Sequence, residues 1–223
     1  MTAAAWEPGV DLRGATGVFG GTFDPVHVAH LALAEAARDV LGLERVLFVP
    51  AGEPPHKVGL SITPAEDRFA MVQAAIAGND GFAASRVELD RDGPSYTVDT
   101  LRSLRAERRA AGDTRDLALI LSAEAFLALP TWHDPRGVLE RAALVVAPRE
   151  GYPDAAPDFL ERHFAGVPVR AVFLDGPRLR LSASELRTRA AAGWSLRYLV
   201  PDAVAAYIGD HALYQDPRRT DRT

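Results

Sequence analysis

The apolar residues of this chain fall into short runs bounded by turn residues, and these runs alternate with segments of helical periodicity. Short continuous apolar runs are typical of strands that are buried on both faces of a sheet. They predict strands at residues 17–19, 46–49, 117–121, 144–147 and 169–174. The sequence therefore favours a sheet whose strands are separated by helices.

Apolar positions spaced three and four residues apart fill the intervening segments. They predict helices at residues 29–41, 64–77, 95–109 and 183–192. Thr63, Pro64 and Glu66 predict an N-cap, a first-turn proline and a capping-box acid for the second helix. Ser182 and Glu185 predict a capping box for the last helix.

Strands that alternate with helices favour right-handed βαβ crossovers. We therefore expect an α/β fold with a doubly wound, mostly parallel sheet and helices on both faces. The length of 223 residues suits a single domain, with a core at about residues 15–214 and polar ends outside it. Such sheets bind ligands at the carboxyl ends of their strands.

The composition narrows the classes of function. With 48% hydrophobic and 25% charged residues, the chain has the balance of a soluble globular protein. A net charge of −5 argues against a nucleic acid partner, and the absence of cysteine excludes thiol nucleophiles, disulfides and cysteine-ligated metals. No secretory signal or membrane-spanning apolar stretch stands out, so we expect a cytoplasmic protein without membrane association.

The sequence GGTFDPVHVAH, at residues 20–30, follows the first predicted strand and begins the first predicted helix. Gly20 and Gly21 let the backbone pass close to a ligand, and the free amides of a helix start favour an anion. His27 and His30 share one helix face and can reach one ligand together. A metal would need further ligands, none of which stands at an obvious spacing. We interpret the stretch as a phosphate site, with a capped helix carrying two partly buried histidines as the structural alternative.

GGTFDPVHVAH resembles the GGxFDPxHxxH signature of the nucleotidyltransferase superfamily related to class I aminoacyl-tRNA synthetases. The resemblance implies a Rossmann-like fold, ATP or CTP as donor, and histidines that hold and stabilise the reacting phosphates. Members act on nicotinate mononucleotide, phosphopantetheine, glycerol phosphate or choline phosphate, and the signature alone does not choose among them. Within it, Asp24 followed by Pro25 is interpreted as a turn former.

Four further segments narrow the choice: PPHK at 54–57, PSYTVDTL at 94–101, PTW at 130–132 and LSASELR at 181–187. In this order they resemble segments of bacterial nicotinate-nucleotide adenylyltransferases, and the resemblance extends from about residue 17 to about residue 214. It implies ATP and nicotinate mononucleotide as substrates, with nicotinate adenine dinucleotide and pyrophosphate as products, in NAD synthesis.

The same resemblance assigns residues to each substrate. The ATP site that it implies comprises Gly20, Gly21, Thr22, Phe23, His27, His30, Ser182, Ser184 and Arg187. The catalytic set around the phosphates comprises His27, His30, Lys57 and Arg187. The nicotinate mononucleotide site comprises Tyr96, Thr97, Trp132 and Glu124, with Trp132 stacked on the pyridine ring. No protein side chain is assigned to a metal.

Several of these positions also have a structural interpretation. PSYT could merely cap a helix, and Trp132 could belong to the core. Lys57 is the one lysine among 25 lysine and arginine residues. It either binds phosphate or is a loop lysine that was retained by chance. Ser122 and Glu124 stand where the family usually shows glycine and aspartate, so the contact expected there, to a nucleotide sugar or a metal-bound phosphate, is in doubt.

The implied chemistry needs no general base, because the attacking phosphate is already ionised. Catalysis then consists of holding two anions in line and neutralising the charge that grows on them. We expect Mg²⁺ to be held mainly by the ATP phosphates and water. Phosphopantetheine adenylyltransferase and a nucleotide-binding protein without turnover are the alternatives, and a homo-oligomer is compatible with the sequence.

Overall fold

The computed structural model describes residues 3–5, 10–55, 61–153 and 157–215. Within these ranges one sheet has the strand order β1-β7-β6-β5-β2-β3-β4. Its strands are β1 (Ala3–Ala5), β2 (Thr16–Gly21), β3 (Arg45–Pro50), β4 (Phe82–Ala84), β5 (Leu117–Ser122), β6 (Ala143–Ala147) and β7 (Ala171–Leu174). β2 to β7 pair in parallel, whereas β1 runs antiparallel to β7 at one edge. The predicted mostly parallel sheet is confirmed, and only the two three-residue edge strands were not predicted.

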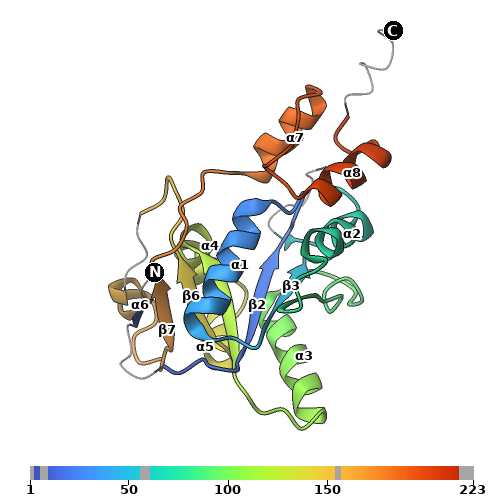
Figure 1. Cartoon of the computed structure of the whole chain (residues 1–223). Helices are drawn as coiled ribbons and strands as arrows, with labels where there is room; N and C mark the ends of the chain where they lie inside the picture. The colour runs from blue at the N-terminus through green and yellow to red at the C-terminus, as the bar shows by residue number, and fades with distance from the viewer. Residues whose placement is uncertain (1–2, 6–9, 56–60, 154–156, 216–223) are drawn as a thin grey trace, which may run out of the picture.

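Helices cover both faces of this sheet (Figure 1). They are α1 (Val28–Leu41), α2 (Ala65–Ile76), α3 (Thr97–Ala110), α4 (Ala123–Ala128), α5 (Pro135–Arg141), α6 (Pro157–His163), α7 (Ala183–Ala191) and α8 (Asp202–Asp210), with the 3₁₀ turn η2 (Leu129–Thr131) after α4. Buried residues of α1, α2, α7 and α8 belong to one apolar core, and those of α3, α4, α5 and α6 belong to the other.

The strand residues explain why two cores form. In β5, Ala118 and Ile120 join the first core, while Leu117, Leu119 and Leu121 join the second. Successive side chains of a strand point to opposite faces, so a continuous apolar run supplies both cores at once. The doubly wound fold inferred from such runs is thus present.

The strand order reverses between β2 and β5, which are neighbours in the centre of the sheet. From β2 the chain proceeds outward to β3 and β4, and from β5 it proceeds outward in the other direction to β6 and β7. Doubly wound sheets bind ligands in the crevice at this reversal, outside the carboxyl ends of the strands. Figure 1 shows α7 and α8 beyond the end toward which β2 points.

The helix starts agree only in part with the predicted caps. Ser182 caps α7, since its Oγ accepts a hydrogen bond of 3.2 Å from the Glu185 N–H. The cap predicted at Thr63 is wrong: the N-cap of α2 is Pro64, and no side chain caps it. Glu66 instead binds Arg86 at 2.7 and 2.9 Å, so the predicted capping-box acid serves an ion pair.

Candidate functional site

The signature residues 20–30 lead from the end of β2 into α1, at the point where the strand order reverses. A Cβ added to Gly20 would meet nothing within 4 Å, so the backbone there borders open space. At Gly21 the same atom would lie 3.1 Å from the Phe23 ring. Phe23 has a left-handed backbone (φ 50°) and a buried side chain, so contact with a nucleotide is left to its main chain.

His27 and His30 lie together at the start of α1. His27 is the N-cap, and the two imidazole rings stack with centroids 3.7 Å apart and planes 19° apart. The His27 N–H donates to His30 Nδ1 at 3.2 Å. Because a neutral imidazole has one donor and one acceptor nitrogen, this bond places the His30 proton on Nε2. His30 therefore presents an N–H donor from a fixed ring.

The electrostatics keep both histidines uncharged. Burial, and to a smaller extent the positive charge of Arg149, lowers the pKa of His27 to about 4. Burial also holds the pKa of His30 well below its usual value, with added effects of His27 and Arg149. His27 Nδ1 is buried and has no hydrogen-bond partner among the described residues. A buried polar nitrogen without a partner is costly, and a ligand oxygen can satisfy it.

Arg187 reaches the signature loop from α7, near the other end of the chain. Its Nη1 donates to the Asp24 main-chain oxygen at 2.8 Å, and its Nη2 donates to Ser184 Oγ at 3.2 Å. Ser182 caps the same helix. Arg187 thus links the start of α7, which carries Ser182 and Ser184, to the loop before the two histidines. Lys57 lies outside the described residues.

The residues expected at the pyridine ring begin α3 and follow η2. Tyr96 is the N-cap of α3, Thr97 is its first residue, and Trp132 ends η2. Tyr96 and Trp132 both pack, partly buried, against the second core. The Tyr96 ring stacks on His133, with centroids 4.2 Å apart. His133 was not singled out in the sequence, although it directly follows Trp132.

The loop after β3 is attached to this region. The Glu53 N–H donates to Ser95 Oγ at 3.1 Å, and the Ser95 N–H donates to the Glu53 oxygen at 2.9 Å. The guanidinium group of Arg68, a residue that is 1% exposed, binds the same loop. It donates to main-chain oxygens of Thr63, Thr22 and Gly52 at 2.9, 2.8 and 3.2 Å. Arg68 therefore ties the signature loop to the loop after β3.

Glu124 and Arg149 face each other across the ends of β5 and β6. Arg149 Nη1 lies 2.8 Å from Glu124 Oε2, and the Arg149 guanidinium lies over the Tyr152 ring at 5.6 Å. Ser122 Oγ accepts from the Ala125 N–H at 3.3 Å and caps α4. Sequence reasoning missed Arg149, although it stands two residues beyond a predicted strand, at the edge where ligands bind.

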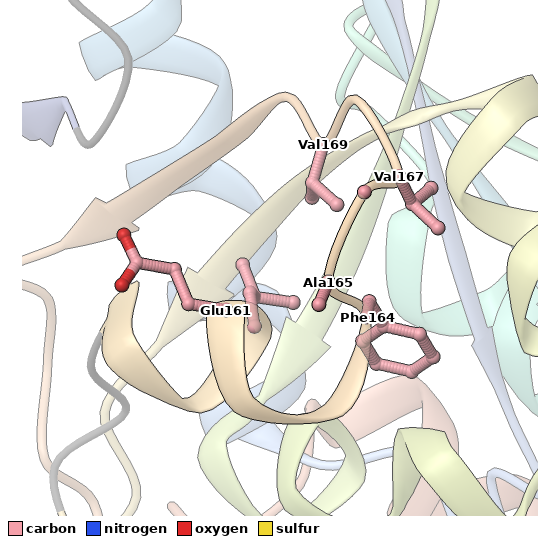
Figure 2. A pocket seen from close by; sticks show the side chains of 7 residues that line it. Glu161, Phe164, Ala165, Val167 and Val169 are labelled. Carbon is pink, nitrogen blue, oxygen red and sulfur yellow. The ribbon is translucent and has the colours of Figure 1, made fainter.

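A separate hollow of about 290 Å³ lies beside α6. Figure 2 shows its lining, which consists of Leu160, Glu161, Phe164, Ala165, Gly166, Val167 and Val169. These residues are mostly apolar, and none of the expected site residues is among them. This hollow therefore lies apart from the residues that the sequence assigned to the site.

The fold and the signature loop define a nucleotide-binding α/β protein of the nucleotidyltransferase type. The family model that matches residues 18–189 is described as cytidylyltransferase-like. A probable nicotinate-nucleotide adenylyltransferase of Thermomicrobium roseum is 44% identical over 215 residues, which cover 93% of this chain and 97% of that protein. The enzyme of the same name from Thermus thermophilus is 45% identical over 199 residues, covering 89% and 98%. The chain belongs to the nicotinate-nucleotide adenylyltransferase family.

Solved structures agree on the fold. Plasmodium falciparum nicotinic acid mononucleotide adenylyltransferase complexed with NaAD superposes with a TM-score of 0.73 at 15% identity, covering 91% of this chain and 98% of that chain. The same enzyme complexed with APC gives a TM-score of 0.72.

In the described part of this chain, no helix is long and apolar enough to cross a membrane.

Proposed function

We propose that this protein transfers the adenylyl group of ATP to nicotinate mononucleotide, forming nicotinate adenine dinucleotide and pyrophosphate for NAD synthesis. One observation carries the proposal: two neutral imidazoles and Arg187 converge on a signature loop at the reversal of strand order. Imidazole and guanidinium donors suit phosphate oxygens. The similarity to nicotinate-nucleotide adenylyltransferases supports nicotinate mononucleotide as the substrate that accepts the adenylyl group.

In the reaction, a phosphate oxygen of nicotinate mononucleotide attacks the α-phosphorus of ATP. The bond to the bridging oxygen breaks, and its electron pair leaves with pyrophosphate. His30 Nε2–H and His27 donate to the α-phosphate as charge grows on its oxygens, which is most effective for donors fixed in advance. Arg187 and Lys57 neutralise the β- and γ-phosphates. The attacking oxygen is already ionised, so none of these residues serves as a general base.

Arg149 adds a positive charge that the sequence did not suggest. It is close enough to lower the pKa of both histidines and is held by Glu124 on a partly exposed surface. We place it on a substrate phosphate, with Glu124 releasing it when the anion binds. Tyr96, Thr97 and Trp132 hold the pyridine ring, with His133 supporting Tyr96 by the stack described above.

Mg²⁺ fits this site as a companion of ATP rather than a resident ion. Groups of three histidine or carboxylate side chains that could hold a metal are absent from the described ranges. His27, His30 and Arg187 are donors and not the oxygen ligands that Mg²⁺ prefers. The Asp24 carboxylate is bound by Tyr214, and the Glu124 carboxylate pairs with Arg149. When bound, Mg²⁺ supplies charge neutralisation at the β- and γ-phosphates, and the ATP oxygens with water would hold it.

A panel of acceptors tests the proposal. Pyrophosphate release from ATP is measured with nicotinate mononucleotide, nicotinamide mononucleotide and phosphopantetheine. We expect the highest kcat/KM with nicotinate mononucleotide. In nicotinamide mononucleotide, the amide N–H group would face donors that suit a carboxylate, and this mismatch should lower kcat/KM about tenfold to over a hundredfold. Faster turnover of phosphopantetheine, or no release with any acceptor, would contradict the assignment.

A further inference from the structure

Tyr214 connects the far end of the described chain to the signature loop. It follows α8, and its hydroxyl donates to Asp24 Oδ1 at 2.7 Å. Asp24 is only 3% exposed and lies three residues before His27. The contact therefore ties residue 214 to the loop that leads into the histidine pair.

Asp24 is also the attachment point of Arg187. The Arg187 Nη1 donates to the Asp24 main-chain oxygen at 2.8 Å and lies 3.8 Å from Asp24 Oδ2. The Thr63 N–H donates to the same Oδ2 at 3.4 Å. A buried carboxylate needs such partners, because an unpaired charge in the interior is strongly unfavourable. Without the Tyr214 hydroxyl, Oδ1 would lose its close donor, and Asp24 would shift toward its other partners.

The backbone around Tyr214 is held in an uncommon conformation. Ala212 and Tyr214 have φ angles of 51° and 62°, in the left-handed region that residues with a Cβ rarely adopt. Leu213 and Tyr214 pack against the first core. The hydroxyl of Tyr214 is a donor at neutral pH, and burial and the bond to Asp24 raise its pKa further. The chain thus turns back on itself in a way that brings this donor to Asp24.

We propose that Tyr214 is a positioning residue for adenylyl transfer, which acts through Asp24 to set His27, His30 and Arg187 relative to one another. The inference rests on the roles proposed above for these three residues. Tyr214 itself touches no reacting atom. Small displacements of aligned donors slow a reaction steeply, whereas binding of either substrate depends on many other contacts. Loss of the hydroxyl should therefore lower kcat and leave KM nearly unchanged.

Tyr207 provides a matched control. It lies on α8, and its hydroxyl donates to Asp67 Oδ1 on α2 at 2.8 Å, which is the same kind of bond away from the signature loop. The substitutions Tyr214→Phe and Tyr207→Phe each remove the hydroxyl and keep the ring. We expect Tyr214→Phe to lower kcat about tenfold to a hundredfold with both KM values within about twofold. Tyr207→Phe should keep the wild-type kcat and lose less thermal stability than Tyr214→Phe, because Asp67 is only partly buried whereas Asp24 is buried.

Asp24→Asn gives a second test that does not depend on Tyr214→Phe folding well. The amide keeps the shape, one oxygen acceptor and the main-chain contact to Arg187, but it removes the carboxylate charge 3.8 Å from Arg187 Nη1. We expect kcat to fall while KM stays nearly constant. Wild-type kcat in either Tyr214→Phe or Asp24→Asn would overturn the positioning role, as would an equal loss of kcat in Tyr207→Phe. His30→Ala is assayed alongside. If it kept full activity, the site on which the inference rests would be refuted instead.

Discussion

The two sides of the strand-order reversal are built differently. On the β2 side, His27 and Asp24 are 5% and 3% exposed, and hydrogen bonds fix the loop without any substrate. On the β5 and β6 side, Glu124 and Arg149 form an ion pair with side chains 45% and 37% exposed. Exposed ion pairs contribute little stability and can change partners. The difference indicates preformed donors on one side and an adaptable positive charge on the other.

The largest expected effect tests the preformed side. Replacing His30 by alanine removes a donor whose contact strengthens with transition-state charge, so kcat should fall about 10²- to 10³-fold. ATP binding should weaken far less. His163 on α6, which is exposed, provides the control, and His163→Ala should behave like the wild type. Steady-state pyrophosphate release measures both variants, and a near-normal kcat in folded His30→Ala would assign the ring to structure.

The depressed pKa of His27 predicts a pH dependence of stability. In the unfolded chain His27 takes up a proton below about pH 6.5, whereas in the folded protein its pKa is about 4. As the pH falls through this window the unfolded state binds more protons, so the free energy of unfolding decreases. The loss reaches up to about 3 kcal/mol at pH 4 and is absent above pH 7.

Urea unfolding at pH 7.5, 6 and 5 measures this loss in the wild type and in His27→Gln, which stays neutral throughout. The wild type should lose more stability than the variant over this range. Parallel curves for the two proteins would show that His27 titrates normally in the folded state and would remove the case for neutral donors.

Substitutions on the β5 and β6 side, at Arg149, should lower activity less than His30→Ala does. Arg149→Met removes the charge that we place on a substrate phosphate, and a lost charge-assisted hydrogen bond corresponds to about tenfold to a hundredfold in kcat/KM. Arg149→Lys keeps the charge without the planar fork and should fall between. Identical kcat/KM in all three proteins would restrict Arg149 to its ion pair with Glu124.

Glu124 should have the smallest effect of the four. Since it holds a partly exposed arginine, Glu124→Gln should change the free energy of unfolding by less than about 1 kcal/mol. Its effect on kcat/KM should be at most about fivefold, and additivity with Arg149→Met should fail because the two side chains are in contact. A loss as large as that of His30→Ala would instead place Glu124 directly on a substrate, as its family position suggested.

The sequence predicted most of the fold because its strands are continuous apolar runs that supply two cores. It also predicted that His27 and His30 lie side by side at the start of α1, since their spacing in the chain is a local property. Arg149, His133 and Arg68 were missed because their partners are distant in the chain and no local pattern marks them. The predicted capping box failed for the same reason. Glu66 pairs with Arg86, 20 residues away, and the Thr63 N–H donates to Asp24, 39 residues away.

Nitrogen NMR of the histidine side chains tests the central claim most directly. In uniformly ¹⁵N-labelled protein at pH 7, the account predicts that His30, assigned by comparison with His30→Ala, is neutral with its proton on Nε2 and a bare Nδ1. The bare Nδ1 accepts the His27 N–H, so the signal should persist unchanged down to pH 5. Two protonated nitrogens at pH 7, or a proton on Nδ1, would contradict the preformed neutral donor.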